Sequence, residues 1–485
     1  MLVKGKEADN LTTVRSRTKI LATLGPQTST TESIKQLVTS GMSAVRLNMS
    51  HGNHDFFSSL FENIHTVRTE LNCPLAILAD LQGPKIRIGE LSKPEIEILS
   101  GNKIEITTEE ILGTEKIIST SYKNLPNDAE IDDVILINDG LIRLRIISKN
   151  EKSILCEIQN GGILSPRKGM NLPGMNLSTQ SLSEKDFNDL NFLIKHPVDY
   201  IALSFVRKAD DILQLKEWLE KHGKVIPVIA KIEKKEAIDS FDSILPVADG
   251  IMIARGDLGV ELSPQDVPVV QKKIIQRCNE VGKLVITATQ MLESMISNPM
   301  PTRAEASDVA NAVWDGTDVV MLSGETSIGK NPVPTVKMMR EIVLNAEKHF
   351  VSNENMSFHI PEVFEENLFD SVCKGITLVA KQIKAKVIVV FTFKGRAAKG
   401  IAKYRPEANI IAISNSFETM NNLCLRWGVT SLYKEKIDKE RIAINDARKM
   451  ILNAGFAKKG DLVIFMSTSP QSEKSRTDWL RFEVF

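Results

Sequence analysis

Short apolar runs alternate with longer amphipathic stretches along the first two thirds of the chain. The runs are rich in β-branched and aliphatic residues, and the stretches between them carry apolar residues at helical spacing. This alternation is typical of βα units around a parallel sheet, an α/β fold. Eight runs, the number that closes a (β/α)8 TIM barrel, occur up to residue 325: 18–25, 43–50, 75–81, 199–206, 225–233, 250–258, 283–290 and 318–325.

Two helix starts are visible between these runs. Ser183 is followed by Asp186 in the pattern S-x-x-D, and Thr302 is followed by Glu305 in the pattern of a capping box. We therefore expect helices to begin directly after Ser183 and Thr302.

The regular spacing breaks once, between the third and fourth runs. Residues 88–168 form short segments of alternating apolar and polar residues, punctuated by Gly, Asn and Asp. The pattern predicts a small inserted antiparallel β-barrel domain, carried on a barrel loop, which could act as a lid.

A third region follows the barrel. A helical stretch at 372–384 precedes strand-like runs at 386–393, 409–415, 429–435 and 461–469, which predicts a separate C-terminal α/β domain. The expected boundaries are 1–87 with 169–348 for the catalytic barrel, 88–168 for the lid and 349–485 for the C-terminal domain.

Composition and charge narrow the class of protein. The 485 residues are 42% hydrophobic and 25% charged, with 61 basic and 61 acidic side chains, so neither nucleic acid nor a membrane surface is an expected partner. The first twenty residues have no apolar core of a signal peptide, and no stretch is long enough to span a bilayer. The five cysteines are scattered, which argues against disulfides and zinc. We expect a cytoplasmic protein.

Reactive side chains gather where the predicted strands end, which is where barrel enzymes build their active sites. Arg46, Asn48 and Ser50 are two residues apart and so share one face of the second strand, and His51 follows in the turn. Any one of these could be a solvated strand end or a structural ion pair, but together they indicate a site. The other strand ends carry Asp80, Lys231, Glu233, Asp257, Thr289, Ser323 and Glu325.

Two of these residues are hard oxygen ligands on neighbouring strands. The apolar run that ends in Lys231 and Glu233 would desolvate both charges unless they met a counter-ion, a metal or an anionic ligand. Glu233 with Asp257 predicts a Mg²⁺ site that leaves positions for water and substrate oxygens. Lys231 and Arg46 add positive charge, which suits a substrate with both a carboxylate and a phosphate.

Other motifs are weaker. Segment 324–330 matches most of a P-loop, but Asn331 stands where a hydroxyl residue should bind magnesium, and Pro332 and Pro334 follow. No G-x-G-x-x-G follows a strand, so dinucleotide binding has no support. His51 and His54 are three residues apart in a loop with no third ligand nearby, so we do not expect a metal there.

Read in order, these segments resemble the pyruvate kinase family over nearly the whole chain. The motifs are TKILATLGP, RLNMSHG, ADLQGPKIRIG, AKIEK, ARGDLGVEL, ATQMLESM, MLSGETSIGKNPV and KYRP. The resemblance implies Mg²⁺-dependent phosphoryl transfer from phosphoenolpyruvate to ADP, giving pyruvate and ATP in glycolysis, with Mn²⁺ as a possible substitute. It also implies a homotetramer.

The resemblance further implies roles for the substrate-binding residues. Lys231 would stabilise the transferring phosphoryl group and the enolate, Arg46 would contact the phosphate, and Glu233 and Asp257 would hold the metal. The backbone from Arg255 through Gly256 to Asp257 would receive the substrate carboxylate together with Thr289. A relay that protonates enolpyruvate would consist of Thr289, Ser323 and Glu325.

The nucleotide side of the site follows from the same resemblance. His51 and Arg87, with Lys168 from the lid, would face the nucleotide phosphates, and Asp139 would help to orient the closed lid.

One departure from the family pattern concerns potassium. Many members carry D-T-K-G-P-E where this chain has Asp80-Leu-Gln-Gly-Pro-Lys85, and potassium-dependent members hold the ion among positions matching Asn48, Ser50, Asp80 and the missing threonine. Lys85 could supply a tethered charge in place of the ion, so we expect activity without potassium. The alternative is that Lys85 is an ordinary solvated lysine.

The C-terminal domain holds a possible site for a phosphorylated allosteric effector. The segment matching the family's effector loop keeps Thr392, Lys394, Gly395 and Arg396, whereas segment 469–480 lacks the usual glycine-rich turn. Two other classes of protein remain open: a Mg²⁺-dependent pyruvate or oxaloacetate lyase or aldolase on the same barrel, and a catalytically silent scaffold. The scaffold would require the loss of a key side chain, and none is lost.

Overall fold

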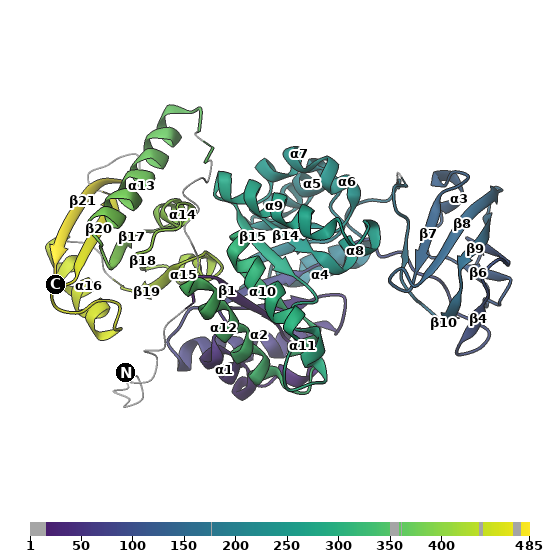
Figure 1. Cartoon of the computed structure of the whole chain (residues 1–485), viewed down its shortest axis with the longest axis horizontal. Coiled ribbons are helices and arrows are strands. Elements are labelled where there is room, and N and C mark those ends of the chain that lie inside the picture. Colours follow the sequence, from purple (N-terminus) through teal and green to yellow (C-terminus); the bar gives the residue numbers. More distant parts are fainter. Residues whose placement is uncertain (1–15, 176, 350–357, 360, 436–439, 469–476) are drawn as a thin grey trace.

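The computed structural model describes residues 16–175, 177–349, 358–359, 361–435, 440–468 and 477–485. They form three bodies in a row, with a barrel between a β-rich insert and a C-terminal α/β domain (Figure 1). The central sheet closes in the order β1-β16-β15-β14-β13-β12-β3-β2, and its strands are parallel, so the predicted eight-stranded barrel is confirmed. Its strands are β1 (Lys19–Thr23), β2 (Ala44–Asn48), β3 (Ala76–Asp80), β12 (Tyr200–Leu203), β13 (Val228–Ile232), β14 (Gly250–Ala254), β15 (Leu284–Ala288) and β16 (Val319–Leu322).

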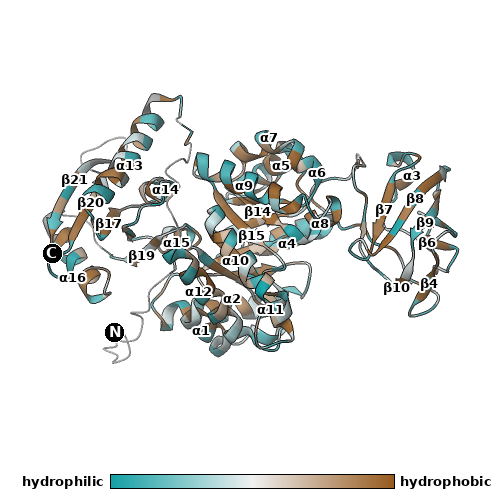
Figure 2. Ribbon diagram, viewed as in Figure 1, coloured by the Kyte–Doolittle hydropathy of each residue, from teal (hydrophilic) through white to brown (hydrophobic). Residues whose placement is uncertain are grey.

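These strands are mostly apolar because both of their faces are buried, as the hydropathy colouring shows (Figure 2). On β13, Ile229 packs inside the barrel, whereas Val228, Ala230 and Ile232 pack against the surrounding helices. The interior core also contains Leu425 from the C-terminal domain. The reactive side chains therefore stand at one end of a fully packed barrel.

Helices surround the barrel, and two of them begin where the sequence predicts. The side chain of Ser183 accepts a hydrogen bond from the Asp186 amide at the start of α4, and Thr302 accepts one from Glu305 at the start of α10, as expected. The elements around the barrel are η2 (Pro26–Thr28), α1 (Thr31–Ser40), α2 (His54–Glu70), α4 (Glu184–Leu193), α5 (Ala209–Lys221), α6 (Lys235–Asp239), α7 (Phe241–Val247), α8 (Arg255–Glu261), α9 (Val267–Val281), η3 (Glu293–Ile296), α10 (Arg303–Asp315), α11 (Gly324–Ser327) and α12 (Pro332–Lys348).

The insert has its own apolar core and two sheets. A six-stranded sheet runs in the order β11-β7-β8-β9-β5-β6, and a two-stranded sheet pairs β10 with β4. All neighbours are antiparallel except β5 and β6. The sheet continues beyond residue 168, because β11 pairs with β7. Its elements are β4 (Ile96–Ile98), β5 (Lys103–Thr107), β6 (Ile117–Ser119), α3 (Leu125–Asp128), β7 (Val134–Ile137), β8 (Ile142–Lys149), β9 (Ser153–Asn160), β10 (Gly162–Leu164) and β11 (Met170–Asn171).

The C-terminal domain is a five-stranded sheet in the order β19-β18-β17-β20-β21. The sequence did not predict β21, which pairs antiparallel to β20 where residues 477–480 were expected in a loop. Residues 469–476 of that expected loop lie outside the described residues. The elements are α13 (Phe364–Gln382), β17 (Val387–Phe391), α14 (Arg396–Lys403), β18 (Asn409–Ser414), α15 (Phe417–Leu423), β19 (Val429–Tyr433), α16 (Glu440–Asn453), β20 (Leu462–Thr468) and β21 (Thr477–Val484). Within the described residues, no helix is long and apolar enough to cross a membrane.

Candidate active site

A buried charge network stands at the carboxyl end of the barrel strands. Lys231 at the end of β13 lies 2.9 Å from Glu233 and 3.2 Å from Asp80, and it donates a hydrogen bond of 2.7 Å to Ser204. Asp80 at the end of β3 also pairs with Arg46 of β2 at 2.6 Å. Four charged groups from three strands therefore meet in one cluster.

Asp80 and Lys231 in this cluster hold each other ionised. Burial acts to raise the pKa of Asp80, but the cations of Lys231 and Arg46 outweigh burial and bring that pKa below its usual range. Burial acts to lower the pKa of Lys231, but Asp80 and Glu233 outweigh it, so the pKa is raised and the ammonium stays charged. The site thus presents a fixed positive charge at a position closed to bulk water.

Glu233 and the nearby Asp257 form the candidate metal site. Glu233 is 1% exposed and accepts a hydrogen bond of 2.7 Å from the Phe205 amide. Burial raises the pKa of Glu233, Lys231 opposes that shift, and the Asp257 carboxylate adds to it, so the two carboxylates repel each other. Hard oxygen donors that repel each other suit a divalent cation. In the described part of the chain, no group of three or more His, Cys, Asp or Glu side chains is placed to hold a metal ion by itself.

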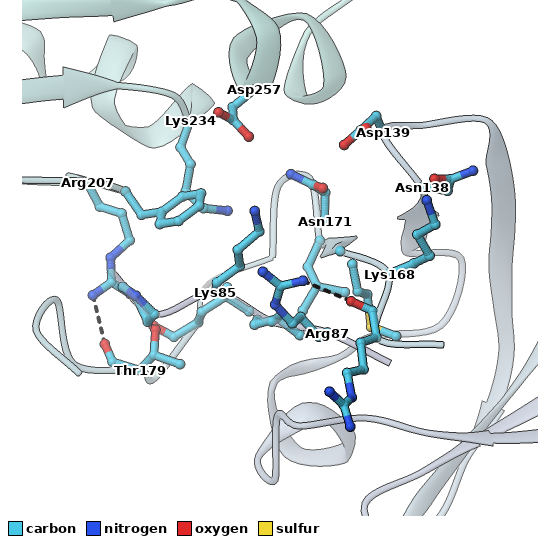
Figure 3. A pocket seen from close by; sticks show the side chains of 18 residues that line it. Lys85, Arg87, Asn138, Asp139, Lys168, Asn171, Thr179, Arg207, Lys234 and Asp257 are labelled. Carbon is cyan, nitrogen blue, oxygen red and sulfur yellow. Dashed lines mark hydrogen bonds between the residues drawn. The ribbon is translucent and has the colours of Figure 1, made fainter. Parts of the chain in front are cut away.

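The sequence analysis expected Asp257 at the end of a strand, but the structure places it in a helix. Strand β14 ends at Ala254, and Asp257 lies in the first turn of α8. The turn into this helix puts the carboxylate at the wall of a cleft rather than in the barrel interior (Figure 3).

Thr289 and Gly256 lie together at the ends of β15 and β14. The Gly256 amide donates a hydrogen bond of 2.8 Å to the Thr289 hydroxyl, and Thr289 adopts the left-handed backbone conformation with a φ of 67°. The Arg255 side chain turns away from this amide, because it pairs with Asp308 at 2.7 Å and donates to the Thr289 carbonyl. Arg255 therefore braces the turn with its guanidinium, while its backbone remains beside the site.

Ser323 and Glu325 follow β16. The Glu325 carboxylate is fully buried and accepts hydrogen bonds from the amides of Ser323 and Leu292, at 2.7 and 3.1 Å. The Ser323 hydroxyl is buried without a hydrogen-bond partner among the described residues. The next amides are used within the chain, since Gly329 bonds to Gly324 and Lys330 to Ile296, so segment 324–330 does not form a phosphate-binding P-loop.

A cleft of about 200 Å³ lies between the barrel and the insert. Figure 3 shows Lys85 pointing toward Asp257 and Asn171, and Asp139 facing the cleft from the insert. Burial lowers the pKa of His51, and the cations of Lys85 and Arg87 add to the effect, so the imidazole is neutral beside a strongly basic wall. Residues of the cleft that the sequence analysis named are Lys85, Arg87, Asp139, Lys168 and Asp257.

Comparison with known proteins agrees with this geometry. Residues 15–336 match the family model "Pyruvate kinase, barrel domain", and residues 370–482 match "Pyruvate kinase, alpha/beta domain". The chain is 41% identical to the pyruvate kinases of Staphylococcus aureus strains MRSA252 and USA300 over 470 residues, which cover 96% of this chain and 80% of each relative. The crystal structure of a pyruvate kinase from Cryptosporidium parvum superposes with a TM-score of 0.92 at 35% identity, over 98% of this chain and 97% of that one.

The chain belongs to the pyruvate kinase family. As a pyruvate kinase family member it is an enzyme of phosphoryl transfer, and the lyase or aldolase alternative is not favoured.

The sequence analysis missed several residues of this site. Lys234 and Asn171 both contact Glu261 at 3.3 Å, so a buried carboxylate on the helix that carries Asp257 is tied to strand β11 of the insert. Arg207, in the same cleft, donates a hydrogen bond of 2.7 Å to the Thr179 carbonyl. Nothing in the local sequence distinguishes these residues from polar surface residues, because each lies far along the chain from the residue that it contacts.

The positions that match the family's potassium site differ in their burial and in their contacts. Asn48 accepts a hydrogen bond from the Ser50 amide at 3.2 Å, and Leu81 is 1% exposed and packs in the core between barrel and helices. Lys85 is exposed, lies on the cleft wall and forms no ion pair with Asp80 in the described structure.

The residues of the expected effector loop lie at the start of α14. Thr392 accepts a hydrogen bond of 2.9 Å from the Gly395 amide, and Gly395 has a φ of 76°. The Arg396 guanidinium lies 4.4 Å from the centre of the Phe369 ring, and Lys394 is exposed.

Outside the cleft, the His54 imidazole is 2.9 Å from Asp189 and stacks on Phe192, which gives this histidine a structural role.

Proposed function

We propose that this enzyme transfers the phosphoryl group of phosphoenolpyruvate to ADP at the carboxyl end of the barrel, with one Mg²⁺ held by Glu233 and Asp257. The observation that carries the proposal is the buried Lys231 ammonium, fixed between Asp80 and Glu233 at the carboxyl end of the barrel strands. Such a preorganised charge stabilises negative charge that develops on oxygen. Mn²⁺ would substitute for Mg²⁺, since both favour oxygen ligands.

The proposed step moves the phosphoryl group from one oxygen to another. A terminal oxygen of ADP attacks phosphorus, the bond between phosphorus and the enol oxygen breaks, and pyruvate enolate remains. Lys231 and Arg46 stabilise the transferring group and the enolate oxygen. Bound Mg²⁺ would supply further positive charge to the same oxygens.

The carboxylate of the substrate would lie against the amides of Gly256 and Asp257 and the Thr289 hydroxyl. Protonation of the enolate carbon by water then gives pyruvate, and Thr289 with the unpartnered Ser323 hydroxyl would position that water. Glu325 would act through Ser323, whose amide donates a hydrogen bond of 2.7 Å to the Glu325 carboxylate.

The nucleotide phosphates would bind His51, Arg87 and Lys168, beneath an insert of residues 88–168 that acts as a lid on the barrel of residues 1–87 and 169–348. Asp139, in a turn of consecutive positive-φ residues, would orient the closed lid. Closure would exclude water that could hydrolyse the phosphoryl donor.

The test of this function is pyruvate release from phosphoenolpyruvate. We expect release only when ADP and Mg²⁺ are both present, because the phosphoryl group needs an acceptor and a metal. Release without ADP would contradict phosphoryl transfer and would favour a hydrolase or a lyase.

We further propose that the enzyme does not need potassium. Leu81 offers no side-chain oxygen and is buried in the core, and the Asp80 charge is already compensated by Arg46 and Lys231. Lys85, which lines the cleft, provides a tethered positive charge.

Activity should therefore be unchanged, within about twofold, when potassium replaces tetramethylammonium at constant ionic strength, because the positive charge that the ion would supply is already present. The double variant L81T/K85E, which restores the commoner family pattern, should become stimulated by potassium. Strong stimulation of the unmodified enzyme by potassium would refute this proposal.

We propose a homotetramer that works in the cytoplasm. Strand β21 lies at the edge of its sheet, and its outward row Leu480, Phe482 and Val484 is 43%, 50% and 62% exposed. An apolar edge strand is a template for pairing with a second copy. Light scattering on the purified enzyme in solution should give the mass of four chains. The F482K variant should give a smaller mass, with its helix content intact. A monomeric unmodified enzyme would contradict this assembly.

We propose that Thr392, Lys394, Gly395 and Arg396 bind a phosphorylated effector. A turn that presents a left-handed glycine and two basic side chains at the start of a helix suits a phosphate group. Sugar phosphates and nucleotides should shift the substrate saturation curve of the enzyme, and K394M should remove the shift. Unchanged curves across such a panel would remove the proposal.

A further inference from the structure

A second cationic cavity lies away from the active site, at the junction of the barrel and the C-terminal domain. Its volume is about 10 Å³. Barrel residues from the α9–β15 turn and the start of β16 form one side, and residues of α14 and the segment after α15 form the other. Its charged lining is made of Lys283, Lys399, Lys403, Arg405, Arg426 and Asp318.

The nearby carboxylates compensate only part of this positive charge. Arg405 pairs with Asp318 at 2.7 Å, and Lys403 pairs with Asp370 at 2.8 Å. The field of Asp249 reaches Lys283 and Lys399, but Asp249 is itself paired with a third lysine. Among the described residues, no carboxylate forms an ion pair with Lys399 or Arg426.

Three donors at this junction have no acceptor. Arg405 Nη1 and Arg426 Nε are buried without a hydrogen-bond partner among the described residues. Lys399 Nζ forms no hydrogen bond or ion pair within the part of the chain that the structure describes. Buried donors without acceptors are unfavourable, and unpaired cations more so.

The electrostatics of Lys399 agree with this geometry. Burial, with a smaller contribution from the Arg426 cation, lowers the pKa of Lys399 to about 8, and Asp249 partly opposes the shift. The ammonium thus lies in a positive field and lacks the counter-charge that would hold its proton.

We propose that this cavity binds one small inorganic anion, chloride or phosphate, through Arg405, Arg426 and Lys399. The cavity has room for about one particle the size of a water molecule, so it excludes nucleotides and sugar phosphates. A chloride ion would lie within it, whereas phosphate would place one oxygen among the donors and its remaining oxygens toward solvent. Guanidinium and ammonium donors form strong charge-assisted bonds to either ion. The anion would neutralise the charge between the two domains and so hold them together.

The test is calorimetric titration of the full-length enzyme with sodium chloride and with sodium phosphate, in sodium gluconate at constant ionic strength. Phosphoenolpyruvate without ADP is present in every titration, so that phosphate does not bind in the active site. We expect saturable binding of one equivalent per chain, at least about fivefold weaker in K399M and in R426Q, because each removes one charged donor. Whether chloride alone or both ions bind identifies the class of anion that occupies the cavity.

K35M, which removes an exposed lysine outside this cavity that pairs with Glu70 at 3.4 Å, is the matched control and should bind as the unmodified chain does. Trp427 lines the same cavity, so its fluorescence should change in step with the heat, and W427F should abolish that change. Binding in K399M equal to that of the unmodified chain, or no saturable heat with either ion, would overturn the proposal. If R426Q does not fold, K399M alone decides the question.

Discussion

Replacing Lys231 by methionine is expected to lower kcat by about a thousandfold, the scale found when a preorganised charge at a transition state is removed. The ammonium is the cation held between Asp80 and Glu233, and methionine keeps the volume of the side chain without its charge. The KM for ADP should change little, because the nucleotide contacts lie elsewhere in the cleft. Steady-state kinetics of pyruvate formation measures both quantities.

A structural effect must be separated from a catalytic one in this variant. Without Lys231, Glu233 loses its ion-pair partner in a buried position, which destabilises a fold by several kcal/mol, on the order of 3–5. Melting curves and far-ultraviolet circular dichroism report that loss. K35M removes an exposed lysine that pairs with Glu70 at 3.4 Å, and it should leave both rate and stability unchanged. A folded K231M enzyme with near-normal kcat would show that the proposed role of Lys231 is wrong.

Replacing Glu233 by glutamine is expected to raise the Mg²⁺ concentration needed for half-maximal activity by at least about tenfold and to lower kcat by about a hundredfold. Glutamine keeps the size of the side chain and can still accept from the Phe205 amide, so the loop should stay in place. Only the anionic ligand is lost. Activity measured against Mg²⁺ and against Mn²⁺ separates metal affinity from the rate at saturating metal.

The matched control for this variant is E217Q. Glu217 pairs with Lys221 on the exposed face of α5, at 2.8 Å, so its neutralisation should not affect the metal dependence. An unaltered Mg²⁺ curve in E233Q would place the metal elsewhere, whereas equal effects in both variants would point to a general change in surface charge.

Much of the fold could be predicted from local sequence because barrel strands are buried on both faces. Residues 250–254 form a strand with no polar side chain, and such runs are visible without knowledge of their partners. The caps at Ser183 and Thr302 were equally local, since each partner lies three residues away. Strand β21 was missed because its outward side chains alternate with Arg481 and Glu483, so a polar segment hid an apolar row.

The composition of the site could be predicted better than its connections. The sequence showed that Lys231 and Glu233 end the same apolar run, but it could not show that Asp80, some 150 residues earlier, holds the same ammonium. The sequence also could not show that Arg255 turns to Asp308, or that Asn171 ties the insert to Glu261. Such contacts depend on how strands and loops assemble in space, and they cannot be predicted from local sequence patterns.

The most direct test of the central claim follows the phosphorus atom itself. Phosphorus NMR of the enzyme with phosphoenolpyruvate, ADP and Mg²⁺ should show the substrate signal replaced by the γ-phosphate signal of ATP, in equal amount and in step with pyruvate. Inorganic phosphate in place of ATP, or consumption of phosphoenolpyruvate at the same rate without ADP, would contradict phosphoryl transfer at this site.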